Sequence, residues 1–176
     1  MQALNQIQFS HFRRSLLAGA CDDGALYTWD SNTKTQLRRF DVGAGGHSAP
    51  CTGLVFSPCN HMLLASVGLD ANIICYDVVS DKVIKSMPTG DALSSVDLLS
   101  DGSTIVVGSN RGRLLVFDFR KTSEPVSTVV AHHSAISRLC FSLNFPSDPK
   151  VSLNIICSHN IIHDITVSNV SPLGLY

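Results

Sequence analysis

The chain has 176 residues, of which 44% are hydrophobic and 15% charged, and its formal net charge is −1. This composition predicts one folded domain and excludes a disordered chain, and the near-neutral charge argues against nucleic-acid or membrane-surface partners. No secretory signal pattern opens the sequence, and no apolar run reaches the roughly 18 residues of a membrane span. The six cysteines form no C-x-x-C pair, so we expect reduced thiols, several of them core fillers, in an intracellular protein.

Three apolar stretches end in an aromatic residue followed by aspartate: Trp29-Asp30, Tyr76-Asp77 and Phe117-Asp118. These aspartates are 47 and 41 residues apart. The surrounding sequence aligns with itself in three copies, 7–40, 54–87 and 96–129, and a fourth copy begins at 138. A period of this length is typical of folds that repeat one structural unit.

Each copy contains four short apolar runs separated by turn residues. In the second copy the runs fall near 52–57, 62–67, 72–77 and 82–87, with Asp, Asn, Gly, Pro and Ser between them. Such runs favour strands over helices, so we expect each copy to form a four-stranded antiparallel meander. The runs show little polar alternation, which indicates sheets covered on both faces. Radial packing of such sheets gives a β-propeller, whose recorded signature is a period of about 40–45 residues ending in WD.

The second copy carries a fuller set of motif residues in a fixed order. Gly46-His47 precedes the first strand, Phe56-Ser57-Pro58 ends it, Ala65-Ser66 lies in the second, Asp70 follows in the turn, and Tyr76-Asp77 closes the third. In this order and spacing, the chain resembles the WD-repeat β-propeller family over residues 2 to about 142. The resemblance implies an all-β, incomplete propeller of about three blades plus part of a fourth. The blades are expected near 2–40, 46–87 and 89–130, with a fourth starting at 131 and a divergent or truncated tail at 143–176.

The resemblance also implies a structural hydrogen-bond set in each blade. In the second copy it consists of His47, Ser66, Asp70 and Tyr76, with Tyr76 standing where the family usually has Trp. Asp23 and Trp29 are its members in the first copy, and His132 is the member in the fourth. We expect the Trp29 ring to fill the gap between adjacent blades and Asp30 to begin a turn. The third copy has Thr89-Gly90 in place of the histidine and Arg111 in place of the turn aspartate, so it should lack the set.

Other groups of residues that could suggest a metal, phosphate, catalytic or modification site have simpler interpretations. Cys157, His159 and His163 are too few and too poorly supported for a metal site, which needs about four ligands. Gly43-Ala44-Gly45-Gly46 lacks the G-K-[ST] ending of a phosphate loop and is expected to join two blades. No G-x-S-x-G elbow supports a hydrolase. Ser57-Pro58 and Ser171-Pro172 match proline-directed phosphorylation, although Ser57-Pro58 is better explained as a turn. We therefore expect no enzyme activity, no cofactor and no bound metal.

The regular pattern ends after Ser142, and an open arc of blades would leave apolar faces and strand edges uncovered. We therefore expect a fragment or short isoform, with the missing blades supplied by a longer chain. The stretches SLLAGACDDGALYTWD and GSNRGRLLVFDFR are similar to the branch of the family that targets the γ-tubulin ring complex to centrosomes and spindles. That likeness implies a protein-interaction scaffold for microtubule nucleation in the cytoplasm and cytoskeleton, although the branch engages γ-tubulin through a C-terminal region without counterpart here.

Loops on rigid scaffolds tend to carry binding, so we expect partner proteins, possibly γ-tubulin complex components, to contact one loop-bearing edge of the propeller. The candidate contact residues there are Asn72, Asp91, Asn110, Arg111 and His133. The alternative function is a substrate adaptor in a ubiquitin-ligase or chromatin complex.

Overall fold

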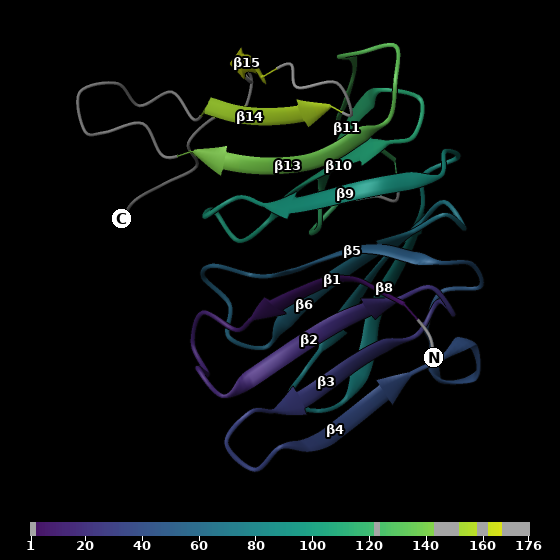
Figure 1. Cartoon of the computed structure of the whole chain (residues 1–176). Coiled ribbons are helices and arrows are strands. Elements are labelled where there is room, and N and C mark those ends of the chain that lie inside the picture. The colour runs from purple at the N-terminus through teal and green to yellow at the C-terminus, as the bar shows by residue number, and fades with distance from the viewer. Residues whose placement is uncertain (1–2, 122–123, 143–151, 158–161, 167–176) are drawn as a thin grey trace.

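The computed structural model describes residues 3–121, 124–142, 152–157 and 162–166, and these ranges form antiparallel β-sheets (Figure 1). The first sheet contains β1 (Leu4–Phe9), β2 (Leu16–Cys21), β3 (Leu26–Asp30) and β4 (Thr35–Phe40). The second contains β5 (Cys51–Phe56), β6 (Leu63–Gly68), β7 (Asn72–Asp77) and β8 (Lys82–Pro88). The third contains β9 (Leu93–Leu98), β10 (Thr104–Ser109), β11 (Arg113–Asp118) and β12 (Ser127–Val130). The fourth contains β13 (Ile136–Ser142), β14 (Ser152–Cys157) and β15 (Ile162–Thr166).

The strands of each sheet follow one another in chain order, so every sheet is an antiparallel meander. This confirms the predicted all-β fold, an incomplete propeller. Two segments of the predicted tail extend the fourth sheet, because β14 pairs with β13 and β15 pairs with β14. Helical structure in the described ranges is limited to one 3₁₀ turn, Val42–Ala44, which lies in the connection from β4 to β5. None of the described helical structure is long and apolar enough to cross a membrane.

The four sheets lie side by side in chain order, and their first strands β1, β5, β9 and β13 are successive neighbours (Figure 1). Apolar side chains fill the spaces between sheets. One buried cluster joins the first and second sheets and another joins the second and third. A smaller cluster joins the third sheet to β13. Since the second sheet is buried on both faces, its strands need no polar alternation, which explains the continuous apolar runs of the sequence.

In the second and third sheets, the aromatic residue just before the aspartate that ends the third strand faces the preceding sheet. Tyr76 and Phe117 are both fully buried, and Tyr76 lies 4.7 Å, centroid to centroid, from the ring of Phe40 in the first sheet. Trp29 occupies the same register position in the first sheet, but no described sheet precedes it. That its ring fills a gap between adjacent blades therefore stays a prediction. Within the described residues, its ring stacks on Tyr27, the neighbour two residues away, at 5.5 Å between centroids.

Candidate functional site

The turns between second and third strands lie beside the connections between sheets, at one edge of the molecule. We call this edge the rim; it comprises the turns 22–25, 69–71 and 110–112 and the connections 41–50, 89–92 and 131–135. A positive φ recurs at one position of each turn, at Gly24 (80°), Ala71 (60°) and Gly112 (74°). Close approach adds a second reason for glycine, because a Cβ on Gly24 would lie 2.3 Å from the carbonyl oxygen of His47.

Backbone hydrogen bonds tie each rim turn to the connection that follows its sheet. The carbonyl oxygens of Gly24, Ala71 and Gly112 accept from the N–H groups of His47, Thr89 and Ala131, at 3.0, 2.8 and 3.0 Å respectively. The same geometry thus recurs three times. These hydrogen bonds join each rim turn to the neighbouring connection, so the exposed side chains of both project from an ordered backbone.

The second sheet brings His47, Ser66, Asp70 and Tyr76 together. Nδ1 of His47 lies 2.9 Å from Oδ1 of Asp70, and Nε2 lies 2.7 Å from Oγ of Ser66. The Ser66 hydroxyl lies 3.4 Å from the hydroxyl of Tyr76, which in turn donates to the carbonyl of Gly45 at 3.2 Å. The tyrosine oxygen therefore takes part in the network in the place where the family usually has an indole nitrogen.

Burial decides the charge of this network. It lowers the pKa of His47, and the hydrogen bond and charge of Asp70 oppose that shift only in part. The pKa of Asp70 is also lowered, because hydrogen bonds from His47, the Ser48 N–H and Asn72 outweigh its desolvation. A neutral imidazole consequently donates from Nδ1 to a carboxylate and accepts from the Ser66 hydroxyl at Nε2. Since His47 and Ser66 are both 0% exposed, the serine cannot reach a substrate, and the network fastens a connection to a turn.

In the first sheet, different residues stabilise the rim turn. Asp23 stands in its rim turn at the position of Asp70, and its carboxylate accepts from the Ala25 N–H at 3.0 Å. Its other oxygen lies 3.2 Å from Nη2 of Arg39 on β4. The guanidinium also lies over the Tyr27 ring, 5.5 Å from its centroid. An arginine from the same sheet thus replaces the histidine of the entering connection.

The third sheet has a reversed version that the sequence did not reveal. Asp91, in the entering connection, forms ion pairs with Arg113 and, at 3.4 Å, with Arg111, both beside the rim turn. The acid and the base have exchanged places relative to Asp70 and His47. The Asp91 side chain is 0% exposed, so its predicted role as a partner-contacting residue is wrong. The sign reversal and the shift of two residues from Thr89 hid this pair from motif alignment.

The remaining predicted residues have varied surroundings. Nδ1 of His132 accepts from the N–H and hydroxyl of Ser134, at 3.0 and 2.7 Å. Ser57 is 1% exposed and its hydroxyl accepts from the Asn60 N–H at 3.1 Å, which fits a turn and not a modification site. The side chains of Cys157, His159 and His163 lie outside the described residues, as does Ser171. The described part of the chain contains no cluster of three or more metal-ligating side chains.

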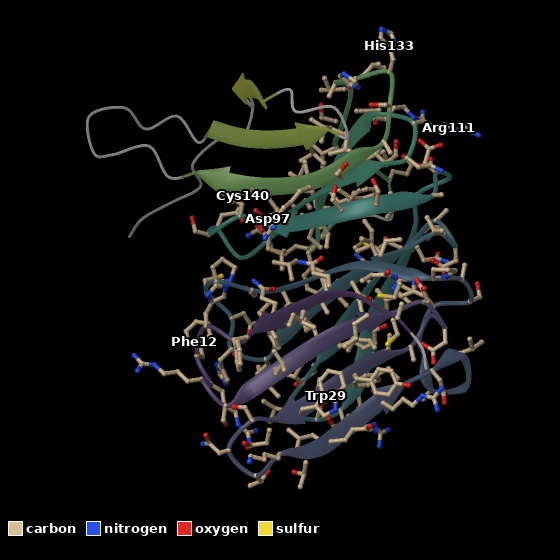
Figure 2. All side chains as sticks on the ribbon, viewed as in Figure 1. Phe12, Trp29, Asp97, Arg111, His133 and Cys140 are labelled. Carbon is tan, nitrogen blue, oxygen red and sulfur yellow. The ribbon has the colours of Figure 1, made fainter. Side chains whose placement is uncertain are left out.

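Three predicted contact residues are exposed on the rim: Asn110, Arg111 and His133. Figure 2 shows Arg111 and His133 pointing away from the sheets at that edge. The Arg111 side chain is 74% exposed although it pairs with Asp91. Asn72 is half-buried, and its side-chain amide donates to the Asp70 carbonyl at 3.1 Å, so it stabilises the turn. The available contact surface is therefore narrower than predicted and lies on the third sheet and the connection after it.

Comparison with known proteins agrees with this architecture. Residues 35–77 match the family described as "WD domain, G-beta repeat". The chain is 37% identical to Protein NEDD1 of Mus musculus over 153 residues, which cover 87% of this chain and 23% of that protein. It is 35% identical to Protein NEDD1 of Homo sapiens over 158 residues, covering 90% of this chain and 23% of that protein. The chain thus spans about a quarter of the length of these relatives.

The fold is also similar to a chain in the "Crystal Structure of Mitotic Checkpoint Complex", with a TM-score of 0.73 and 22% identity. The likeness covers 88% of this chain and 44% of the other. At this identity the comparison supports the arrangement of sheets only.

Proposed function

Because this chain belongs to the WD-repeat β-propeller family, we propose that it is a non-enzymatic protein-interaction scaffold that helps target γ-tubulin complexes to the centrosome and spindle. The identity of 35–37% to NEDD1 over about nine tenths of the chain carries this proposal. Because that likeness covers about nine tenths of the chain, it is not confined to one repeat motif. Protein partners and a cytoskeletal location are the broader part of the proposal, and the γ-tubulin complex is the specific part.

The rim is the surface that we assign to the partner. Its backbone is held by recurring hydrogen bonds, so binding would require little ordering of the loops, and less conformational entropy would be lost. Arg111 and His133 present cationic and aromatic-like groups there, and arginine is enriched at the energetic centres of protein interfaces. The buried Asp91 keeps Arg111 near one position while leaving most of its surface accessible.

The test is localisation of the tagged full chain in dividing cells, together with co-purification of γ-tubulin. We expect signal at spindle poles and recovery of γ-tubulin complex components. A double Arg111→Ala and His133→Ala variant should lose both, whereas Arg14→Ala, which removes an exposed arginine before β2, should retain both. Nuclear signal, or co-purification with a ubiquitin ligase or chromatin complex without γ-tubulin, would instead support the substrate-adaptor function. An unchanged double variant would remove the rim from the proposal.

A further inference from the structure

Two neighbouring turns at the edge opposite the rim carry an exposed aromatic ring and an exposed guanidinium. These turns, 10–15 and 57–62, join the first and second strands of the first two sheets. Phe12 is 52% exposed, and its ring lies edge-on to that of His61, at 6.2 Å between centroids. The Arg13 side chain is 57% exposed. Figure 2 shows Phe12 at the edge opposite to the labelled rim residues. We call Phe12, Arg13 and His61 the Phe12 patch.

The backbone of these turns does not require the side chains of the Phe12 patch. In the first sheet, the Ser10 hydroxyl accepts from the N–H groups of Phe12 and Arg13, at 3.4 and 3.3 Å. In the second sheet, the equivalent serine hydroxyl accepts in the same way from Cys59 and Asn60, at 3.4 and 3.1 Å. The same turn thus forms without an aromatic ring or a guanidinium. Folding of the turn alone therefore does not explain the presence of Phe12 and Arg13.

The repeated turn also fixes the direction of each side chain. Phe12 contacts His61 of the following sheet. Cys59, at the equivalent position, also faces the sheet after its own, because a Cβ on Gly102 would lie 2.6 Å from its Sγ. His61 faces the preceding sheet, so the repeat directs Arg14, which holds the same position in the first sheet, away from the second. The Phe12 patch therefore lies across the first two sheets, and Arg14 is not part of it.

The charge at this edge changes sign between the first sheet and the second. In the first sheet, the turns at this edge contain three cationic residues and one anionic residue: Arg13, Arg14, Lys34 and Asp30. The matching segments of the second sheet, 57–62 and 77–81, contain two aspartates and neither lysine nor arginine. Lys34 and Asp81 even hold the same turn position, with positive φ angles of 58° and 55°. The positive potential is therefore confined to the first sheet, where it favours an anionic group.

Arg13 is held in place while most of its donors stay accessible. Its Nη2 lies 3.0 Å from Oδ2 of Asp30. That carboxylate also accepts from the Asn32 N–H at 2.9 Å and from the Ser15 hydroxyl at 3.3 Å. Because other donors satisfy Asp30, the guanidinium can offer its remaining N–H groups to a second acceptor without leaving a buried carboxylate unpaired. A guanidinium carries five donors in a planar fork that matches a carboxylate.

We propose that the Phe12 patch binds a short acidic segment of a partner protein. A carboxylate of the segment pairs with Arg13, and an adjoining apolar side chain packs on Phe12. Asp77 and Asp81 limit the occupant to a short acidic run, because a nucleic acid or a lipid surface would extend over these carboxylates and be repelled. The proposal goes beyond the scaffold function above and concerns the edge opposite the rim, so either can fail without the other.

The test titrates the purified full chain into a fluorescein-labelled peptide with two glutamates on each side of one leucine, followed by anisotropy. We expect saturable binding that weakens about five-fold in Arg13→Ala and about three-fold in Phe12→Ala, since an exposed ion pair and an apolar contact are lost. Arg14→Ala is the matched control, because it removes the same charge from the same turn outside the patch. It should weaken binding by less than about two-fold, since salt screens distant charges. The Arg111→Ala and His133→Ala double variant should bind as the wild-type chain does.

A second measurement uses only the wild-type chain and so does not depend on the folding of any variant. A peptide with glutamine in place of every glutamate should show no binding. Four results would overturn the proposal: no binding of the acidic peptide, equal binding of the glutamine peptide, equal losses in Arg13→Ala and Arg14→Ala, or tighter binding of single-stranded DNA or phosphatidylserine vesicles that also requires Arg13.

Discussion

At the scale of single residues, a different pair of side chains is found at the rim turn of each complete sheet. Each turn must be fastened by a side chain, and the pairs are Asp23 with Arg39, His47 with Asp70, and Asp91 with Arg113. The second pair contains an imidazole whose pKa is lowered below 6.5 by burial, and it is part of a larger buried network. The first and third use arginine, which stays protonated throughout the physiological range. The three sheets should therefore differ in their response to mutation and to pH.

Replacing His47 with Gln should destabilise the chain. The substitution leaves the buried Ser66 hydroxyl and the Asp70 carboxylate without their shared partner, and a buried unsatisfied group costs about 1–3 kcal/mol. Urea denaturation followed by circular dichroism measures the free energy of unfolding. The exposed His61 provides the control, and His61→Gln should change stability by no more than about 0.5 kcal/mol. Equal effects of the two substitutions would contradict the structural role of His47.

The pH dependence of stability follows from the lowered pKa of His47. Below its ordinary pKa of 6.5, the unfolded chain binds a proton that the folded chain resists, so stability falls as pH decreases from about 6.5 toward the lower folded pKa. Asp70, whose folded pKa lies below 3.8, adds a further loss only in strong acid. Thermal unfolding at pH 7.5 and 5.5 should therefore show a larger loss in the wild-type chain than in His47→Gln. A parallel loss in both would exclude His47 as the titrating group.

In the third sheet, we expect substitution of the buried Asp91 to destabilise the chain more than substitution of the exposed Arg111. Asp91→Asn replaces a fully buried carboxylate with a neutral amide; since the Arg113 side chain is 37% exposed and that of Arg111 74%, water screens part of the loss, which should be about 1–3 kcal/mol. Arg111→Ala should cost at most about 1 kcal/mol, because its side chain is 74% exposed and Arg113 remains. Chemical denaturation of both variants measures the difference. A larger effect from Arg111→Ala would show that Asp91 depends on the outer arginine.

At the scale of strands, β1 is attached to the second sheet by side chains and not by a backbone ladder. Gln6 satisfies both the N–H and the carbonyl of the buried Leu54. Gln6→Leu should therefore leave two backbone groups unpaired and increase amide hydrogen exchange in β1 and β5. Gln36→Leu, at an exposed position on β4, serves as the control and should leave the exchange in β1 and β5 unchanged. Unchanged exchange in Gln6→Leu would mean that packing alone holds the two strands together.

The strands themselves were predictable because turn chemistry and apolar runs are local. The four strands of the second copy were placed within one residue of their observed bounds. The surroundings of Trp29 were not predictable, since its face depends on whether a sheet precedes it. The ion pairs of Asp91 were not predicted for a different reason: its partners lie about 20 residues away, in and beside a turn, and the charges are the reverse of the motif. Periodicity predicts which strands form, whereas contacts between loops depend on three-dimensional neighbours.

At the scale of the whole molecule, the second sheet couples the first to the third. One of its faces contributes Tyr76 to the first buried cluster and the other contributes Cys75 to the second. Neither outer sheet can unfold without exposing an apolar face of the second, so we expect the three sheets to unfold as one cooperative unit. Two probes at different places can test this, because two-state unfolding requires coincident transitions.

Trp29 reports on the first sheet, and the thiol of Cys75 reports on the space between the second and third. Cys75 is 0% exposed, and burial raises its thiol pKa to about 12, so it should resist alkylation until that space opens. In a urea titration, the fluorescence of Trp29 and the alkylation of Cys75, located by peptide mapping, should share one midpoint. An earlier fluorescence transition would show that the first sheet separates on its own. In that case the apolar contact between the first two sheets would be too weak to couple their unfolding.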